Sequence, residues 1–253
     1  MTSSDVTLSV RDLTVRFGAL TAVANVGFDA QRAAITAVIG PNGAGKSSLF
    51  NLISGAIRPN QGSVTLDGQD VTGFSPNRLL AAGLARSFQT TNLFFELTVR
   101  ENLRLAAQFL ECGHGALLPV GSSRIAARRV DELLDEFKLG RRADEVAGTL
   151  SHGEQRRLEI AIATASKPRV LLLDEPTQGM SHADTRETGE LIRSLSRDHG
   201  LTVLLVEHDV DLVMSLSDHV VVMHQGRKLA EGTPAAVRAD PQVQSAYFGT
   251  AHA

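Results

Sequence analysis

The chain has 253 residues, of which 43% are hydrophobic and 21% are charged, and its net charge is −3 at pH 7. This length allows one large domain or two small ones, and the composition is that of an ordinary globular protein. The weakly acidic pI, near 6.2, gives no reason to expect a nucleic acid as partner.

Targeting signals and disulfides are not expected. Cys112 is the single cysteine, so no internal disulfide is possible and a reducing compartment is favoured. Residues Met1–Val10 lack a basic segment followed by an apolar run, which argues against a signal peptide. The most apolar stretches, Val170–Leu173 and Val203–Val206, are too short to cross a bilayer. We therefore expect a cytoplasmic protein that reaches a membrane only through a partner.

The N-terminal part of the chain reads mainly as strands. Alternating hydrophobicity predicts strands over Leu8–Val15 and Val23–Ala30, separated by a turn at Gly18. The following elements are predicted next: a buried strand over Ile35–Ile39, a helix over Lys46–Ser54 closed by Gly55, and a hairpin at Asp67-Gly68 joining Val64–Leu66 to Asp70–Val71.

The rest of the chain reads as a helical stretch followed by alternating strands and helices. From Pro76 to Ala165 the pattern is mostly helical, most clearly over Thr98–Phe109 and Arg124–Phe137. The elements predicted after it are strands over Val170–Leu173, Val203–Val206 and Val220–Met223 and helices over Thr185–His199 and Val210–Ser217. This alternation predicts a mostly parallel, buried sheet with an inserted helical subdomain. After Gly232 we expect one short helix and a frayed end.

Residues 40–47, Gly-Pro-Asn-Gly-Ala-Gly-Lys-Ser, match the phosphate-loop pattern. The glycines let successive N–H groups point at phosphate oxygens, and the helix starting near Lys46 adds its positive end. Lys46 is expected to reach the β- and γ-phosphates, and the hydroxyl of Ser47 to bind Mg²⁺. The pattern predicts nucleotide binding without choosing among ATPases, GTPases and kinases. The predicted binding residues here are Gly40, Pro41, Asn42, Gly43, Ala44, Gly45, Lys46, Ser47 and Ser48.

Two acids, Asp174 and Glu175, follow the apolar strand over Val170–Leu173. In parallel sheets ligands bind beyond the carboxyl ends of the strands. Asp174 is expected to hold Mg²⁺, mainly through water, while Glu175 polarises the attacking water. Alone the pair could be two solvated acids in a turn, but beside a phosphate loop the catalytic interpretation is favoured.

The segment Leu150-Ser-His-Gly-Glu-Gln155, followed by a predicted helix over Arg156–Ala165, resembles the Leu-Ser-Gly-Gly-Gln signature of ABC ATPases. Ser151 and the following N–H groups would cap a helix and form a second anion site. The order and spacing of all motifs agree with that family. The resemblance implies that two subunits face head to tail, each completing the other's ATP site with its signature residues, here Ser151, His152, Gly153, Glu154 and Gln155.

Three further residues occupy family positions. The resemblance implies that Gln89 contacts Mg²⁺ and the attacking water, that His208 contacts the γ-phosphate, and that Phe17 stacks on adenine. Each has a plainer alternative: a surface amide for Gln89, a helix cap for His208 and a core ring for Phe17. Their order along the chain favours the family roles. The implied catalytic residues are thus Glu175, His208 and Gln89, and the implied metal-binding residues Ser47, Gln89 and Asp174.

The sequence departs from the family pattern at three positions. His152 replaces the first signature glycine, and Glu154 replaces the usual glutamine, with Gln155 after it. Ser181 stands where many relatives carry an aspartate that communicates between the two ATP sites. These departures leave ATP affinity across the dimer and cross-talk between its sites open.

The resemblance covers essentially the whole chain and implies an α/β fold. That fold has a P-loop NTPase (RecA-like) core, an N-terminal antiparallel β subdomain and an inserted α-helical subdomain. The implied division of the single ABC ATPase domain, 1–253, is a nucleotide-binding core with β subdomain over 1–88 and 166–232, a helical subdomain with the signature over 89–165, and a C-terminal tail over 233–253.

Three stretches narrow the resemblance: residues 83–94, residues 156–161 and the tail from Glu231 to Gly249. They are similar to the ATP-binding subunits of bacterial branched-chain amino-acid importers, whose relatives move other small polar solutes. This implies ATP and Mg²⁺ as cofactors and a peripheral location on the inner face of the plasma membrane. The implied partners are two membrane permease subunits, a second ATPase subunit, identical or different, and a periplasmic or surface solute-binding protein, with no nucleic acid.

Other functions remain as alternatives. The ATPases of lipopolysaccharide or lipid exporters have a similar tail. Soluble ABC ATPases of nucleic-acid or ribosome maintenance need a long coiled-coil insertion or two ATPase domains, and neither is visible. Glu175 and His208 argue against a nucleotide-binding module that does not hydrolyse ATP.

The stretch from Thr90 to Val99 is unusually apolar for a loop beside an active site. Leu93, Phe94 and Phe95 are consecutive and cannot all face inward, so at least one ring should be exposed. The family resemblance places a permease helix beside Gln89. We therefore expect this stretch to be the permease contact.

Overall fold

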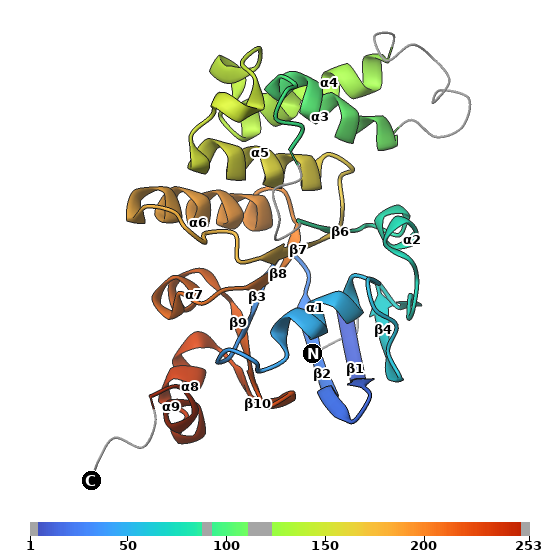
Figure 1. Ribbon diagram of the computed structural model, residues 1–253, viewed down its shortest axis with the longest axis vertical. Coiled ribbons are helices and arrows are strands. Elements are labelled where there is room, and N and C mark those ends of the chain that lie inside the picture. The colour runs from blue at the N-terminus through green and yellow to red at the C-terminus, as the bar shows by residue number, and fades with distance from the viewer. Residues whose placement is uncertain (1–4, 88–92, 111–122, 249–253) are drawn as a thin grey trace.

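The structure is a computed structural model that describes residues 5–87, 93–110 and 123–248. Figure 1 shows helices α3, α4 and α5 gathered at one end of the molecule, with the strands in the other part. Gln89, Thr90 and Cys112, about which the sequence made predictions, fall outside the described residues. Among the described helices none combines the length and apolarity needed to span a bilayer.

The central sheet has six strands in the order β10-β9-β3-β8-β7-β6. All neighbours in it are parallel except β10, which pairs antiparallel with β9. The strands are β3 (Ile35–Ile39), β6 (Leu84–Arg86), β7 (Val170–Asp174), β8 (Thr202–Val206), β9 (His219–His224) and β10 (Arg227–Gly232). Every residue of β3, β7 and β8 is buried, which explains why these strands appear in the sequence as unbroken apolar runs.

A second sheet of four antiparallel strands has the order β2-β1-β4-β5. Its strands are β1 (Val6–Phe17), β2 (Leu20–Gln31), β4 (Gln61–Leu66) and β5 (Gln69–Asp70). The predicted hairpin between β4 and β5 is confirmed. Asp67 and Gly68 both have positive φ, at 46° and 81°, as a tight two-residue hairpin turn requires.

Helices pack on both faces of the central sheet. They are α1 (Lys46–Ile53), α2 (Pro76–Ala81), α3 (Val99–Ala107), α4 (Arg124–Glu136), α5 (His152–Thr164), α6 (His182–Arg197), α7 (Val210–Leu216), α8 (Pro234–Ala239) and α9 (Pro241–Phe248). Short 3₁₀ turns lie over Gln108–Leu110, Gly140–Arg142 and Ala147–Thr149. Side-chain caps define several helix starts, with reciprocal capping boxes at Thr98 of α3 and Ser151 of α5.

Alternate residues of β7 and β8 enter two separate cores. Leu171 and Leu173 pack with the apolar faces of α3, α4, α5 and α6. Val170 and Leu172 pack with α1 and the antiparallel sheet. This division follows from the two-residue period of a strand, which sends successive side chains to opposite faces. The acid pair at the end of β7 is therefore carried by a strand packed firmly on both sides.

Three details of the predicted elements are wrong. The stretch from Pro76 to Ala165 is interrupted by β6, a short edge strand that carries little pattern of its own. Strand β10 was not predicted. The tail holds two helices instead of one: Pro241 lacks an N–H and restricts Asp240, so α8 ends there, and the Asp240 carboxylate accepts hydrogen bonds from the N–H groups of Gln242 and Val243 at the start of α9.

Two helices begin earlier than predicted, because serines cap them. α5 begins at His152, so the signature residues form its first turn, and α6 begins at His182. The α/β fold with an N-terminal antiparallel sheet is observed. The subdomain division at residues 88/89, 165/166 and 232/233 stays a prediction.

Candidate active site

The phosphate loop, residues 40–47, connects the end of β3 to the start of α1. Gly45 precedes α1 in a left-handed conformation, with φ of 97°. A side chain at Gly40 would collide with the carbonyl oxygen of Met223, and one at Gly45 with that of Ala22. The two glycines are therefore required by close approach of neighbouring backbone as well as by loop shape.

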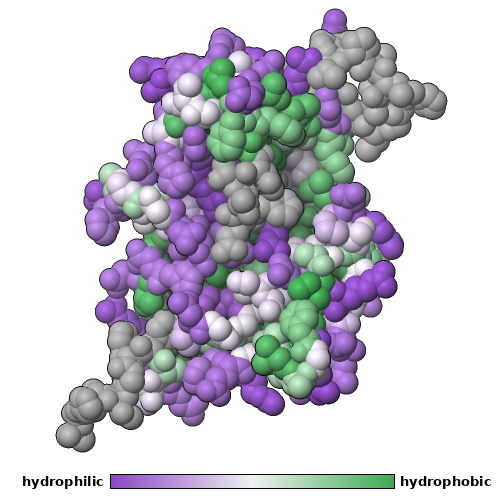
Figure 2. Space-filling view, in the orientation of Figure 1, coloured by the Kyte–Doolittle hydropathy of each residue, from purple (hydrophilic) through white to green (hydrophobic). Residues whose placement is uncertain are grey.

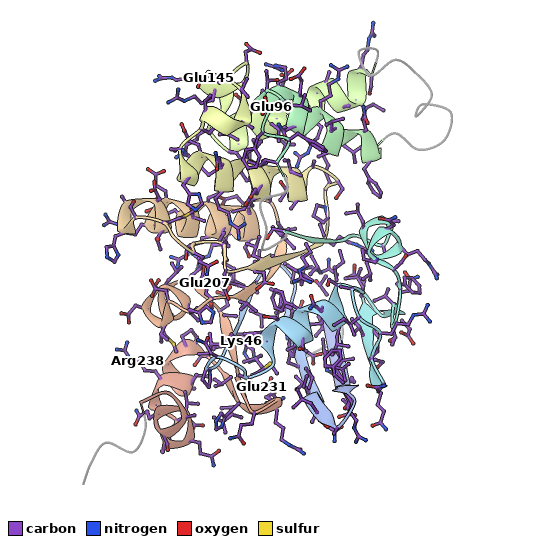
Figure 3. The ribbon with its side chains drawn as sticks, in the orientation of Figure 1. Lys46, Glu96, Glu145, Glu207, Glu231 and Arg238 are labelled. Carbon is purple, nitrogen blue, oxygen red and sulfur yellow. The ribbon has the colours of Figure 1, made fainter. Side chains whose placement is uncertain are left out.

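The side chain of Lys46 lies in the loop and is buried. Its Nζ donates hydrogen bonds to the carbonyl oxygens of Gly40, at 2.6 Å, and Pro41, at 3.1 Å. Burial lowers the pKa of Lys46, while the nearby charges of Glu175 and Asp174 act to raise it. The fold has thus brought the phosphate loop and the acid pair together, as the sequence predicted; Figure 3 shows Lys46 at the start of α1.

Asp174 ends β7 and is almost fully buried. Its Oδ2 accepts a hydrogen bond from Nη2 of Arg86, at 2.8 Å. Nη1 of Arg86 donates to Oδ1 of Asn51 and Oγ of Ser54, at the end of α1. Arg86 therefore joins β6, β7 and α1, and sequence reasoning missed it although it lies only three residues before Gln89.

The remaining oxygen of Asp174, Oδ1, is buried and has no hydrogen-bond partner among the residues that the structure describes. A buried carboxylate oxygen is costly without a partner, and it is a ligand type that Mg²⁺ prefers. Ser47 is exposed at the start of α1 and offers a hydroxyl oxygen. No group of three or more His, Cys, Asp or Glu side chains that could by itself hold a metal ion occurs within the described ranges. This donor set fits Mg²⁺, which keeps several waters and shares phosphate oxygens with a bound nucleotide.

Glu175 and His208 meet at the ends of adjacent strands, β7 and β8. Oε1 of Glu175 lies 2.7 Å from Nε2 of His208. Glu175 is nearly buried, has a positive φ of 48°, and donates its N–H to the carbonyl oxygen of Val206. The imidazole of His208 is exposed. The structure thus joins two of the three predicted catalytic residues, whereas Gln89 lies outside the described residues.

Glu207 is a further buried acid that the sequence analysis did not single out. Its Oε1 accepts hydrogen bonds from the N–H and the hydroxyl of Thr177, and its Oε2 accepts one from the N–H of His208. One side chain therefore holds the loops that follow both strands. Its available signal was a carboxylate directly after a buried strand and directly before the predicted histidine.

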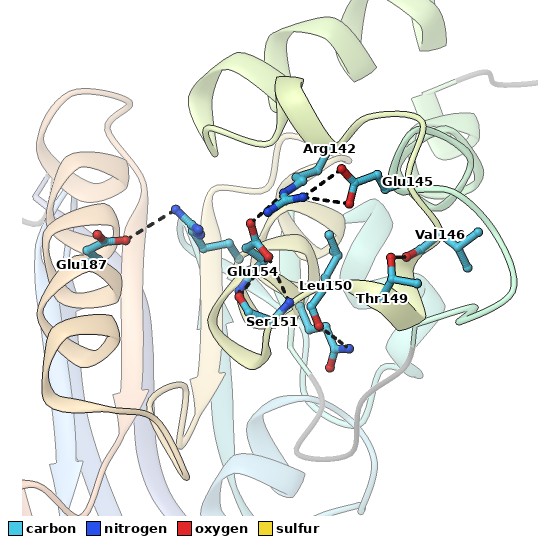
Figure 4. Close-up of polar contacts among 10 residues, drawn as sticks. Arg142, Glu145, Val146, Thr149, Leu150, Ser151, Glu154 and Glu187 are labelled. Carbon is cyan, nitrogen blue, oxygen red and sulfur yellow. Dashed lines mark hydrogen bonds and ion pairs between the residues drawn. The ribbon is translucent and has the colours of Figure 1, made fainter.

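The signature residues form the N-terminal turn of α5 (Figure 4). Ser151 donates its N–H and its hydroxyl to Oε2 of Glu154, and Glu154 donates its N–H to the Ser151 hydroxyl. Oε1 of Glu154 accepts a hydrogen bond from Arg142, which also pairs with Glu145. Burial raises the pKa of Glu154, but the hydrogen bonds from Ser151 and Arg142 outweigh it and hold that pKa below its ordinary value.

The other signature residues have distinct surroundings. His152 is exposed, whereas Gly153 is buried against Asp184 of α6, leaving little room for a side chain. Gln155 donates from Nε2 to the carbonyl oxygens of Leu150 and Ala147. The departure at Glu154 is therefore built into the helix cap, and its charge is matched by Arg142.

Phe17 lies at the tip of the β1–β2 hairpin, opposite Leu20. Its side chain is 49% exposed, so it is not a core ring. Figure 2 shows apolar side chains at this tip. Strand β2 also borders the phosphate loop, because the carbonyl oxygen of Ala22 leaves no room for a side chain at Gly45. The ring predicted to contact adenine is therefore exposed, and the hairpin that carries it lies beside the phosphate loop.

Comparisons with known proteins identify the family to which this chain belongs. Residues 23–178 match the ABC transporter family, and residues 227–253 match the branched-chain amino acid ATP-binding cassette transporter family. The high-affinity branched-chain amino acid transport ATP-binding protein BraF of Pseudomonas aeruginosa is 42% identical over 251 residues, covering 96% of this chain and 98% of BraF. The lipopolysaccharide export system ATP-binding protein LptB of Haemophilus influenzae is 31% identical over 242 residues, covering 96% and 97%.

A crystal structure of a nucleotide-free ATP-binding cassette from an ABC transporter superposes with a TM-score of 0.85 at 29% identity, covering 96% of this chain and 98% of that one. This likeness confirms the P-loop NTPase fold with its antiparallel and helical additions. The chain matches the ABC transporter family and covers nearly the full length of its relatives. This explains why the phosphate loop, the acid pair and the signature occur in one chain. The chain therefore belongs to the ATP-binding and ATP-hydrolysing subunits of ABC transporters, in the group related to branched-chain amino-acid transport ATP-binding proteins.

Proposed function

We propose that this subunit hydrolyses ATP to drive the import of branched-chain amino acids or related small polar solutes through a membrane transporter. The observation that carries the catalytic half is the meeting of Lys46, Asp174, Glu175 and His208 at one edge of the central sheet. The transport half is supported by the 42% identity to a branched-chain amino-acid transport protein and by the match over residues 227–253.

Each predicted site residue has a proposed task. Phe17 stacks on the adenine, and the loop from Gly40 to Ser48 binds the phosphates with its N–H groups and with the ammonium of Lys46. Glu175 accepts a proton from the attacking water, and His208 holds the Glu175 carboxylate and faces the γ-phosphate. Asp174, Ser47 and Gln89 would hold Mg²⁺, which neutralises charge on the β- and γ-phosphates when bound.

The signature residues Ser151 to Gln155 are proposed to act on the ATP held by a second ATPase subunit, identical or different. The capped N-terminus of α5 supports this role, because it presents a hydroxyl and backbone N–H groups at one exposed turn. The subdomain boundaries at residues 88/89 and 165/166 are proposed as the hinge on which this turn moves relative to the core.

A surface near α3 is proposed as the contact with a membrane permease. Leu93 is buried, but Phe94 and Phe95 are 60% and 42% exposed, which agrees with the expectation from sequence. Val146 is also exposed, and its segment bridges to Thr98. Figure 2 shows apolar side chains gathered at the N-terminal end of α3. We call the exposed rings of Phe94 and Phe95 the aromatic patch.

The backbone under the aromatic patch is held rigidly. Asn102, a buried residue of α3, accepts a hydrogen bond from the N–H of Phe94 and donates to its carbonyl oxygen, at 2.9 and 3.0 Å. The N–H of Gly148 donates to the carbonyl oxygen of Phe95. Exposed apolar side chains on a fixed backbone are typical of a contact surface.

Affinity capture and transport assays test the proposal. Capture of the tagged chain from cell membranes should recover two permease subunits and a second ATPase, which places the subunit on the inner face of the plasma membrane. Vesicles containing that complex and its solute-binding protein should accumulate labelled leucine or a related small solute only with ATP. Recovery of ribosomal or DNA-repair proteins would support the soluble alternative. Extraction of lipid from the vesicles would instead support an exporter. LptB represents this alternative, and it is less similar to this chain than BraF is.

A further inference from the structure

Arg156 lies on α5, one turn after the signature residue His152, and points toward the end of β7. Its Nη2 donates a hydrogen bond to the carbonyl oxygen of Asp174, and its Nε donates one to the carbonyl oxygen of Pro176, both at 3.0 Å. These two carbonyls flank Glu175 on either side. Only 11% of the Arg156 side chain is exposed.

The backbone to which Arg156 donates hydrogen bonds has an unusual conformation at Glu175. Glu175 has a φ of 48°, in the left-handed region that glycine favours. Such a conformation persists only where the surroundings determine it. The N–H of Glu175 bonds to the carbonyl oxygen of Val206, and Glu207 holds Thr177. The N–H of Gln178 donates to the carbonyl oxygen of Glu175, and Arg156 donates to the carbonyl oxygens immediately before and after the glutamate.

Arg156 is itself fixed in place. Its Nη1 pairs with Oε2 of Glu159 at 2.6 Å, one turn further along α5, and only 10% of the Glu159 side chain is exposed. A planar guanidinium donates along fixed directions, so two bonds from Nε and Nη2 define both the position and the orientation of the loop. A lysine at this position would be a flexible point charge without that geometry.

We propose that Arg156 is a positioning residue for Glu175, and that it transmits movement of the signature helix α5 to the catalytic loop of the same chain. Because α5 is one continuous helix from His152 to Thr164, a ligand that displaces its first turn also displaces Arg156. Arg156 then changes the orientation of Glu175. The inference rests on the proposed role of Glu175 as general base. It supplies a physical link between the ATP bound at the signature turn and the ATP bound at the phosphate loop.

The neighbouring Arg157 provides a matched control. It has the same charge and lies on the same helix, but it pairs with Glu187 of α6 at 3.5 Å, and the Glu187 side chain is 65% exposed. The full-length chain, in its assembled transporter, should be compared as wild type, Arg156→Gln, Arg156→Lys and Arg157→Gln. ATP hydrolysis gives kcat and KM, and equilibrium binding of ATP gives Kd.

Arg156→Gln should lower kcat about tenfold or more, while the Kd for ATP stays within about twofold of wild type. Arg156→Lys should rescue little of this loss, and Arg157→Gln should retain kcat within about twofold. The dependence of the hydrolysis rate on occupation of both ATP sites should weaken in both Arg156 variants. A folded Arg156 variant with wild-type kcat and cooperativity would overturn the inference; if Arg156→Gln does not fold, Arg156→Lys carries this decision.

A double variant separates this inference from the proposed function. If Arg156 acts through Glu175, then adding Arg156→Gln to Glu175→Gln should reduce the residual hydrolysis no further. A further loss equal to that of the single Arg156 variant would mean that Arg156 acts independently, and the inference would be wrong. Wild-type hydrolysis by Glu175→Gln alone would instead refute the role proposed for Glu175.

Discussion

Nε2 of His208 lies 2.7 Å from Oε1 of Glu175, although the two residues follow different strands of the central sheet. Strands β7 and β8 are parallel neighbours, with Asp174 paired to Val206. The residues that follow them therefore meet at the carboxyl ends of the strands. The contact holds the carboxylate of Glu175 at one orientation. Because these two side chains are in contact at the predicted site, the catalytic role of Glu175 can be tested by substitution.

Glu175→Gln should lower the rate of ATP hydrolysis by about 10²–10⁴-fold, because the amide keeps the size of the side chain but cannot accept the proton. Binding of ATP should be unchanged, and the variant should accumulate as a nucleotide-bound dimer. Steady-state hydrolysis in the assembled transporter and gel filtration with ATP measure both effects. Asp211→Asn, an exposed acid on α7, is the control. Hydrolysis at the wild-type rate would show that another group is the base.

Lys46→Ala should weaken ATP binding at least about tenfold, because one charge-assisted contact contributes about 1.5–3 kcal/mol. The fold should survive, since burial penalises the charged lysine, as its lowered pKa indicates. Equilibrium titration with ATP measures the affinity, and thermal unfolding checks the fold. Lys167→Ala removes an exposed lysine that pairs with Glu132, and it should bind ATP normally. An affinity within about threefold of wild type would refute the role of the phosphate loop.

Arg86→Met should destabilise the protein by about 3–5 kcal/mol, because it leaves the buried carboxylate of Asp174 without its cationic partner. Urea denaturation measures the free energy of unfolding. The control is Arg32→Met, which breaks a pair whose arginine is half exposed; Asp67 keeps its pair with Arg169, so the variant should cost about 1 kcal/mol or less. Equal losses in the two variants would mean that Arg86 is no more than a surface partner.

Glu154→Gln should change how stability depends on pH. The pKa of Glu154 in the folded protein is lower than its ordinary value of 4.5, so its carboxylate stabilises the fold. That contribution is complete above pH 4.5 and is lost as the pH falls through the lower, folded-state pKa. Wild type should therefore be more stable than the variant at pH 7, and the gap should narrow below pH 4.5. A gap that is constant from pH 7 to pH 3 would exclude the carboxylate as its cause.

The double variant Phe94→Ser, Phe95→Ser should lose permease capture and solute uptake while binding ATP like wild type. The rings are exposed, so their replacement removes a contact surface without opening a core cavity. Ile125→Ser, on α4, is the control because that side chain is 63% exposed and lies outside the aromatic patch. Normal co-purification and uptake by the double variant would place the permease contact elsewhere.

Local signals in the sequence predicted a large part of this protein. The phosphate loop, the Asp67-Gly68 hairpin and the buried runs of β3, β7 and β8 each depend on a few adjacent residues, and all were found where predicted. The same is true of the exposed ring expected among Leu93, Phe94 and Phe95. In such segments steric limits and the alternation of side chains leave few choices, and a short stretch of chain therefore determines its own conformation.

The less regular elements needed tertiary contacts. Strand β6 has only three residues and β10 is half exposed, so neither shows the hydrophobic pattern of a buried strand. Each becomes a strand because it completes the hydrogen bonds of β7 or β9 at an edge of the central sheet. Hydrogen bonds between segments far apart in the chain have no local signature.

The same limit applied to the active site. The sequence by itself determined which motif residues carry charge and hydroxyl groups, because their identity and order are local properties. Only the tertiary structure decided that Arg86 pairs with Asp174 and that Glu207 accepts hydrogen bonds from Thr177. The same is true of the hydrogen bonds from Arg156 to the backbone beside Glu175. These polar groups are shielded from solvent and must find partners as the chain closes. Which partner each one meets depends on how β6, β7, β8 and α5 pack together, which no short segment specifies.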